Sequence, residues 1–488
     1  MYVLGISALY HDSAAALIKD GEIIAAAQEE RFTRKKHDNS IPVHAIQYCM
    51  KTVGIDHKNL EVVVYYDNPA LTMERFAANL KYAGQAAEDL LDFSLESLAS
   101  KKMWIHKLIK DAVGGLGLED RLYVTEHHIS HAASAFFPSP FKKAAIITMD
   151  GVGEWATTTI GYGDGNSIRL LKEIDYPHSL GLLYSAFTYF CGFKVNSGDY
   201  KLMGLAPYGK PIYYQLIKDK LIDVKEDGSY RLNLEYFDFQ YGRAMTNEKF
   251  AELFGGSRRE PESRITKREM DMAASVQKVT EEVVILTAKY AKKILGDEVD
   301  NLVLAGGVAL NCVANGKLLN QGIFRDIWVQ PAAGDAGGAL GAALYYYYQK
   351  CGKERLSDGI HDHQKGSFLG PAYSHEEIED FLRVSGYPYE KYADQQELYW
   401  KIADLIDKQN VIGLFQGRME YGPRALGNRS IIGDARSPQM QSKLNLKIKY
   451  RESFRPFAPS VLEEKASDYF ELEGRSPYVA LCRRKRKT

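Results

Sequence analysis

Two histidines and two aspartates are the residues of this chain whose types and spacing point most directly to chemistry. His127 and His131 are four positions apart, so on a helix they would share one face and could converge on a metal ion. Asp150 and Asp335 each stand beside glycines, next to predicted strands. The four side chains make a mixed nitrogen and oxygen set that suits Fe(II), Mn(II) or Zn(II), and the ligand types do not separate these ions.

Each of these residues also has a plainer interpretation. The histidines could cap a helix or pack in the core, and the aspartates could serve as turn or helix-capping residues. A zinc-protease pattern is disfavoured, because residue 128 is histidine where that pattern needs a glutamate as general base.

A second pair, His11 and Asp12, lies near the amino terminus in a predicted hairpin. A histidine oriented by a neighbouring carboxylate can act as a general base. The pair could also be an exposed turn without a role, and on residue types alone that is the simpler interpretation.

Glycine-rich turns follow two of the predicted strands and recur around residue 335. Such turns let backbone amides approach a phosphate or a nucleoside closely. A plain tight turn is the alternative for each one alone, but their order along the chain favours nucleotide binding. The candidate binding residues in these turns are Gly151, Gly153, Gly306, Gly307 and Asn311.

Positive charge is concentrated between residues 416 and 455, in a chain whose net charge is only −1. The first four arginines stand among Gly, Pro and Asn, which favours bidentate binding of phosphate or carboxylate. RNA binding and a solvated surface are the alternatives, and the run lacks the aromatic stacking surfaces of single-strand binders. The basic residues are Arg418, Arg424, Arg429, Arg436, Lys443, Lys447, Lys449, Arg451 and Arg455.

Short strands and hairpins are predicted to position these residues. A hairpin with an acidic turn occurs twice, as it would in a protein built from two related halves. Helical periodicity is strongest over residues 267–295, and a small-residue helix is expected over 339–348. The predicted strands cover residues 2–9, 14–18, 22–27, 144–149, 156–163, 168–174, 301–304 and 326–330.

Length and composition predict a soluble protein of more than one domain. The chain has 488 residues, of which 45% are hydrophobic and 26% charged. No apolar run approaches the roughly 20 residues that span a bilayer, and no signal peptide is visible, so we expect a cytoplasmic protein. The five cysteines are far apart and suggest neither a disulfide framework nor a Cys-rich zinc site. The apolar periodicity stops around residues 351–372, where we expect the main domain boundary.

Six segments together resemble the NodU/CmcH family of O-carbamoyltransferases, and the resemblance runs from residue 1 to about residue 480. The last of the six is the most specific to that family. The segments are 7–15 (SALYHDSAA), 29–37 (EERFTRKKH), 127–135 (HHISHAASA), 201–209 (KLMGLAPYG), 306–311 (GGVALN) and 417–430 (GRMEYGPRALGNRS).

The resemblance implies an α/β architecture: an actin-like domain (a duplicated RNase H-like fold) over residues 1–352, a linker over 353–372, and a YrdC-like domain over 373–488. It also implies a reaction in which carbamoyl phosphate and ATP give carbamoyl-AMP at the second domain. The carbamoyl group would then move to a hydroxyl of a small molecule, such as an antibiotic or a glycan, at the first domain.

Site residues carry over where this sequence matches the family's motifs. His127, His131, Asp150 and Asp335 would hold the metal, which the resemblance implies is iron, and His11 with Asp12 would take the proton from the attacking hydroxyl. The glycines and Asn311 would cradle the nucleotide, with Mg²⁺ a candidate companion of ATP. The remaining cations would bind ATP and carbamoyl phosphate: Lys36, Arg418, Arg424, Arg429, Lys443, Arg451 and Arg455.

In one respect the chain departs from the family. Its members usually continue through an Asn-Thr-Ser-Phe-Asn segment that contributes to the adenylate-forming site, whereas this sequence ends in a basic run at 483–487. We therefore expect an incomplete second domain. The alternatives to carbamoyl transfer are a tRNA threonylcarbamoyl-type transferase and a non-catalytic nucleotide-binding relative. We expect no nucleic acid or membrane partner, and the sequence does not decide between a monomer and a homo-oligomer.

Overall fold

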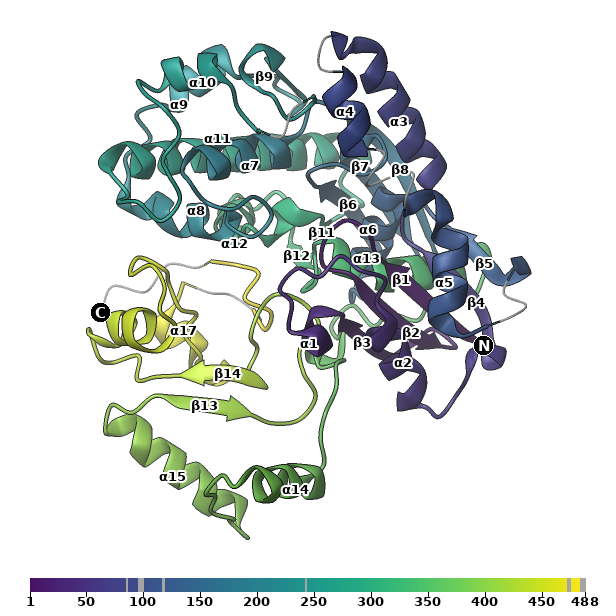
Figure 1. Cartoon of the computed structure of the whole chain (residues 1–488), viewed down its shortest axis with the longest axis vertical. Coiled ribbons are helices and arrows are strands. Elements are labelled where there is room, and N and C mark those ends of the chain that lie inside the picture. Colours follow the sequence, from purple (N-terminus) through teal and green to yellow (C-terminus); the bar gives the residue numbers. More distant parts are fainter. Residues whose placement is uncertain (85–86, 95–100, 116–118, 242–243, 472–474, 483–488) are drawn as a thin grey trace. The chain divides into compact units, whose positions relative to one another are not determined.

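The computed structural model of the chain describes residues 1–84, 87–94, 101–115, 119–241, 244–471 and 475–482 (Figure 1). The chain divides into two compact units, which we call unit 1 (Met1–Lys365 with Ala480–Cys482) and unit 2 (Gly366–Val479). The division after Lys365 falls inside the range 353–372 in which the linker is expected. The basic run at 483–487 lies outside the described residues.

The first half of unit 1 is a five-stranded mixed sheet with the order β3-β2-β1-β4-β5. β1, β2 and β3 form an antiparallel meander, and β4 and β5 run parallel to β1. β1 and β2 are buried along almost their whole length, as expected of strands covered on both faces. The strands are β1 (Tyr2–Ser7), β2 (Ala14–Lys19), β3 (Glu22–Gln28), β4 (Leu60–Tyr65) and β5 (Leu122–Val124).

The second half of unit 1 repeats this plan. Its sheet has the order β12-β11-β6-β7-β8, with an antiparallel meander from β6 to β8 and with β11 and β12 parallel to β6. Two sheets of one topology in one unit confirm the duplicated, actin-like architecture. The strands are β6 (Lys143–Met149), β7 (Ala156–Asp164), β8 (Ser167–Asp175), β11 (Asn301–Ala305) and β12 (Asp326–Val329).

A helix follows the last strand of each half: α6 (His127–Phe136) follows β5, and α13 (Asp335–Tyr345) follows β12. α13 packs on β1 and β2, α6 packs on β6 and β11, and the two helices pack against each other. Their backbones approach closely, because a Cβ added to Gly341 would lie 1.8 Å from the carbonyl oxygen of Ser130. α13 begins four residues before the predicted start at 339, so Asp335 is the first residue of the helix.

The longest helix, α11 (Lys267–Leu295), has the bounds that its apolar periodicity predicts. A capping box between Thr266 and Glu269 begins it, and Gly296, at a φ of 77°, ends it. The other elements of unit 1 are α1 (Glu30–Thr33), α2 (Val43–Thr52), α3 (Pro69–Tyr82), α4 (Ala87–Ser94), α5 (Ile105–Val113), α7 (Leu180–Phe190), α8 (Asp199–Leu205), α9 (Tyr214–Lys220), α10 (Glu248–Leu253), α12 (Cys312–Leu319), β9 (Ile222–Val224) and β10 (Tyr230–Leu232).

Unit 2 is smaller and also combines helices with strands. Its two strands, β13 and β14, pair antiparallel, and neither of its two long helices, α14 and α15, contains a buried residue. Among the described residues of both units, no helix is at once long and apolar enough to cross a membrane. The elements of unit 2 are α14 (His375–Ser385), α15 (Gln395–Asp407), β13 (Ile412–Phe415), β14 (Arg429–Ile432), α16 (Met440–Ser442) and α17 (Ala466–Tyr469).

Candidate metal centre

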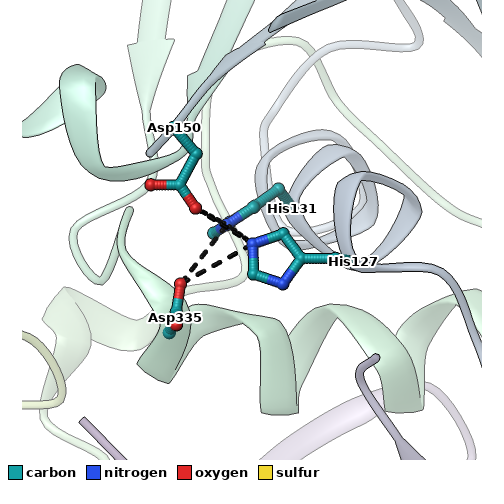
Figure 2. A group of neighbouring side chains, drawn as sticks. All are labelled: His127, His131, Asp150 and Asp335. Carbon is teal, nitrogen blue, oxygen red and sulfur yellow. Dashed lines mark hydrogen bonds and ion pairs between the residues drawn. The ribbon is translucent and has the colours of Figure 1, made fainter. Parts of the chain in front are cut away.

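The four predicted metal ligands meet in unit 1 (Figure 2). His127 and His131 lie one turn apart on α6, Asp150 directly follows β6, and Asp335 begins α13. All four side chains are buried, and one potential ligand atom from each lies within 4.8 Å of the others. The fold therefore brings to one point four residues that are up to 208 positions apart in the sequence.

The contacts within this cluster fit a metal ion. The Nε2 atoms of His127 and His131 are 3.0 Å apart, and they lie 2.9 and 3.1 Å from Asp150 Oδ2. Both are also 3.7 Å from Asp335 Oδ1, a buried oxygen that has no hydrogen-bond partner. Ligands that hold one ion at about 2.1 Å lie roughly 3 to 3.5 Å from one another. A divalent cation would satisfy all four groups at once.

Electrostatics in the cluster also favour a cation. Burial alone lowers the pKa of His127, but its hydrogen bond to Asp150 and the charge of Asp335 raise that pKa to about 9. Burial raises the pKa of Asp335, and it would also raise that of Asp150 if the two histidines did not hold it well below its ordinary value. The two carboxylates thus create a site of negative potential inside the protein.

His11 and Asp12 lie beside this centre, in the turn between β1 and β2. His11 Nδ1 is 2.9 Å from Asp12 Oδ2, and His11 Nε2 is 3.7 Å from Asp335 Oδ2. Burial alone would lower the pKa of His11, but Asp335 and Asp12 raise it to about 10. A cation bound to Asp335 would cancel much of that effect and favour the neutral imidazole.

The glycine turns after β6 and β11 lie against the metal ligands. The amide of Gly307 donates to Asp150 Oδ1 over 3.0 Å, and Gly306, at a φ of 89°, passes so close to Met149 that a Cβ would clash with its carbonyl oxygen. A Cβ on Gly153 would lie 2.9 Å from the ring of His128, whereas a Cβ on Gly151 would meet only Leu182, at 4.0 Å.

Asn311 is fully engaged within the fold. Its Oδ1 accepts from the amide of Ala314 and caps α12, and its side-chain amide forms a reciprocal pair with Gln277. Of the other predicted nucleotide-site residues in unit 1, Lys36 donates from Nζ to the hydroxyl of Tyr200 over 3.1 Å. Lys36 is exposed, and Tyr200 is half-buried.

Several of the basic residues of unit 2 that are predicted to bind phosphate donate hydrogen bonds to backbone carbonyls instead. Arg418 donates to the backbone carbonyls of Leu369 and Gly370. Arg429 makes five hydrogen bonds to backbone carbonyls, and its guanidinium carbon lies 3.6 Å from the ring centroid of Phe415. Three others contact different groups: Lys443 donates to a backbone carbonyl, Arg451 donates to the side chain of Asn445, and Arg455 forms an ion pair with Glu452. Arg424 is half-buried.

The loop that carries Arg424 is built around a carboxylate. Glu420, which is buried, accepts through Oε1 from the amides of Leu426, Asn428 and Arg429 at 2.9 to 3.2 Å. Burial opposes ionisation of Glu420, but these amide donors lower its pKa. The loop that carries Arg424 is therefore held in one conformation by hydrogen bonds within it.

Four residues that were not predicted as site residues lie around the metal centre and the His11–Asp12 pair: Asp67, Lys102, Glu154 and His37. Glu154 accepts from the amides of His127 and Asn68, and Asp67 pairs with Lys102 in a buried contact. His37, next to Lys36, is 2.9 Å from the carboxylate of Asp12. Their only sequence signal was proximity: Glu154 follows the turn of Asp150, and His37 ends a segment that carries the family resemblance.

Comparison with known proteins agrees with these features. The chain matches the family described as Carbamoyltransferase N-terminus over residues 2–344 and the one described as Carbamoyltransferase C-terminus over residues 403–488. It is 55% identical over 98% of its length to the uncharacterized protein sll1178 of Synechocystis sp., and it covers 78% of that protein.

Two nodulation proteins are also similar. The chain is 35% identical over 95% of its length to nodulation protein NolNO of Sinorhizobium fredii, and 37% identical over 71% of its length to nodulation protein NolO of Bradyrhizobium diazoefficiens. It spans 64% and 60% of the lengths of these two proteins.

Two solved structures are remotely similar. The activator of 2-hydroxyisocaproyl-CoA dehydratase from Clostridium difficile is 16% identical, with 73% of this chain and all of that chain covered and a TM-score of 0.37. HypF of T. kodakarensis is 14% identical, with coverages of 72% and 48% and the same TM-score. The family matches span most of the sequence on their own, and the chain is therefore a member of the carbamoyltransferase family of enzymes.

Proposed function

We propose that this chain is an ATP-dependent O-carbamoyltransferase that moves a carbamoyl group from carbamoyl phosphate, through carbamoyl-AMP, to a hydroxyl of a small molecule such as an antibiotic or a glycan. Transfer would take place at the metal centre of unit 1. A YrdC-like domain over residues 373–488 would form the carbamoyl-AMP. The observation that carries the proposal is the buried His₂Asp₂ cluster with His11 beside it, in the part of the chain that matches the carbamoyltransferase amino-terminal family.

His127, His131, Asp150 and Asp335 would hold the ion, and Fe(II) is the first ion to test. When bound, the ion would supply Lewis acidity toward a carbonyl or phosphate oxygen of the donor. The four ligands are buried, and charges interact more strongly in such a position than at the protein surface.

His11 would act as the general base. The acceptor oxygen attacks the carbamoyl carbon, the bond from that carbon to the phosphate oxygen of carbamoyl-AMP breaks, and AMP leaves with the bonding electrons. The hydroxyl proton passes to His11 Nε2, the ring nitrogen that faces the metal centre, while Asp12 holds Nδ1. The turns at Gly151 and Gly306 would line the nucleotide.

Arg424 and the other cations of unit 2 would bind the phosphates of ATP and carbamoyl phosphate. Of this set, Arg424 lies on the loop that Glu420 holds in one conformation through three backbone amides. Lys36 of unit 1 is a separate candidate phosphate ligand. Mg²⁺ would accompany ATP.

The test separates the two half-reactions. With the 488-residue chain, ATP and carbamoyl phosphate, we expect pyrophosphate release that depends on carbamoyl phosphate. With pre-formed carbamoyl-AMP and a panel of glycans and hydroxylated antibiotics, we expect release of AMP and a carbamoylated acceptor. His131→Ala should abolish the second reaction and spare the first, because it removes a metal ligand.

Arg424→Ala should show the reverse pattern, with weaker use of carbamoyl phosphate and unchanged transfer from carbamoyl-AMP. Transfer by His131→Ala at the wild-type rate would refute the role of the metal centre. Equal losses in both assays for Arg424→Ala would refute the division of labour. Absence of bound metal after purification would favour a non-catalytic nucleotide-binding protein, which needs no histidine pair.

A further inference from the structure

Two loops of unit 1 are joined beside His11. The amide of Leu9 donates to the carbonyl of Asn39 over 3.1 Å, and the amide of Ser13 donates to the carbonyl of Asp38 over 2.9 Å. These bonds enclose His11 and Asp12 on both sides. The short turn between β1 and β2 is thus fixed by the loop that follows α1.

The same loop supplies a side chain to Asp12. Asp12 Oδ2 is 2.9 Å from Nδ1 of His11, and Asp12 Oδ1 is 2.9 Å from Nδ1 of His37. The amide of His37 in turn donates to Glu30 over 2.9 Å. One carboxylate therefore bridges two imidazoles, and the second imidazole is anchored through its own backbone.

The backbone at both ends of this bridge is unusual. Asp12 has a φ of 53° and His37 a φ of 55°, in the left-handed region that non-glycine residues adopt only rarely. Such conformations persist where the surrounding structure holds them, and they gather at functional sites. Here the two residues in this conformation are hydrogen-bonded to each other.

Asp12, Glu30 and His37 also have potential ligand atoms within 4.8 Å of one another, so a second metal site has to be considered. Hydrogen bonds already engage the carboxylates of this cluster. Both oxygens of Asp12 face an imidazole nitrogen, and Glu30 already accepts from an amide. At the metal centre, in contrast, a carboxylate oxygen of Asp335 is buried with no partner, whereas the buried atom without a partner in this cluster is Nε2 of His37, whose Nδ1 faces Asp12.

We propose that His37 is a positioning residue for carbamoyl transfer. By donating from Nδ1 to Asp12 Oδ1, His37 keeps the Asp12 carboxylate in the orientation in which Oδ2 accepts from His11. His11 then presents Nε2 to the metal centre. Without His37, one oxygen of Asp12 loses its partner and the carboxylate is free to rotate away from His11. The inference rests on the proposed role of His11 as the base.

Three variants separate the hydrogen bond from the backbone conformation. His37→Asn keeps a donor close to the position of Nδ1, and asparagine tolerates a positive φ. His37→Gly adopts the same φ without strain but has no donor. His37→Leu has neither. If the hydrogen bond is what matters, Asn should retain activity and Gly should not.

The readouts are transfer from carbamoyl-AMP, metal content and the position of His11 in crystals of the full chain. We expect His37→Gly and His37→Leu to lose about 10- to 100-fold in kcat for transfer, with KM for carbamoyl-AMP and metal content unchanged, and His37→Asn to stay within a few-fold of wild type. Carbamoyl-phosphate-dependent pyrophosphate release should be equal in all four chains.

A loss in His37→Asn as large as that in His37→Gly would overturn the proposal, as would full activity of His37→Gly. The crystal structures decide the same question independently of activity. His11 and Asp12 should keep their orientation in His37→Asn and lose it in His37→Gly, and an unmoved His11 in the glycine variant would refute the inference. If the wild-type chain transfers no carbamoyl group, the proposed function fails, whereas the crystallographic result still tests the positioning role.

Discussion

A buried carboxyl group, Glu154, ties His127, the first of the two candidate metal ligands on α6, to the rest of unit 1. It accepts from the amides of His127 and Asn68 and lies next to Asp67. Burial and the neighbouring Asp67 raise the pKa of Glu154 to about 8. Lys102 lowers the pKa of Asp67 to about 2, against the effect of burial. At neutral pH this acid pair therefore holds one proton in the folded protein.

Proton linkage at Glu154 gives a pH-dependent stability. Because its folded pKa lies above its ordinary value of 4.5, the stability that the proton supplies is complete below about pH 4.5 and is lost as the pH rises to about 8. Glu154→Gln cannot ionise and can still donate to Asp67. We expect the variant and the wild type to have similar free energies of unfolding at pH 5.

The two chains should then diverge with increasing pH. The free energy of unfolding of the variant should exceed that of the wild type by an amount that grows by at most about 1.4 kcal/mol per pH unit up to about pH 8. Above that pH the difference should be constant. Urea unfolding monitored at pH 5, 6, 7, 8 and 9 measures this. A difference independent of pH would show that Glu154 is ionised throughout.

The distance between two helices sets the geometry of the metal centre. α6 carries His127 and His131, α13 carries Asp335, and the helices touch where Gly341 faces the backbone of Ser130. A methyl group at Gly341 cannot fit at 1.8 Å from a carbonyl oxygen, so the helices would have to separate. Separation moves Asp335 away from the histidines.

Gly341→Ala should therefore weaken both folding and metal binding. Alanine favours a helix over glycine by about 1 kcal/mol, but overpacking typically costs about 1 to 3 kcal/mol or more, so we expect net destabilisation and reduced metal content. Gly413→Ala is the control, because Gly413 has open space around it. Thermal unfolding and metal analysis of both variants measure the effect. An unchanged metal content in a folded Gly341→Ala protein would contradict the argument.

At the scale of the whole molecule, the ligands come from both halves of unit 1. The two histidines end the first half, and Asp150 and Asp335 belong to the second. A bound ion therefore crosslinks the halves and stabilises the folded state by mass action, by about 2.7 kcal/mol at 100 times the dissociation constant. Added Fe(II) under anaerobic conditions should raise the Tm of the metal-free chain, and a chelator should reverse this.

The matched control for that measurement is His131→Ala, whose Tm should not respond to the metal. A comparable increase in the variant would mean that the ion binds elsewhere on the chain.

The sequence predicted which four buried side chains would cluster and where most strands lie, because residue type and local periodicity report directly on both. The bounds of α11 and the two hairpins were confirmed for the same reason. The sequence could not predict that Arg418 and Arg429 donate to backbone carbonyls. An arginine that binds phosphate and one that binds the backbone are the same residue type, so only the structure separates them. Nor could the sequence reveal His37 and Glu154, whose partners are 25 and 27 positions away along the chain.

Duplication in unit 1 gives each half a turn after its first strand and a helix after its last. The two turns hold Asp12 and Asp150, and the two helices begin at His127 and Asp335. One turn holds a candidate metal ligand, Asp150, and the other holds Asp12, which faces two imidazoles, so the two copies of the turn do different work. Exchanging the two turns should therefore give an inactive protein even though the fold allows it.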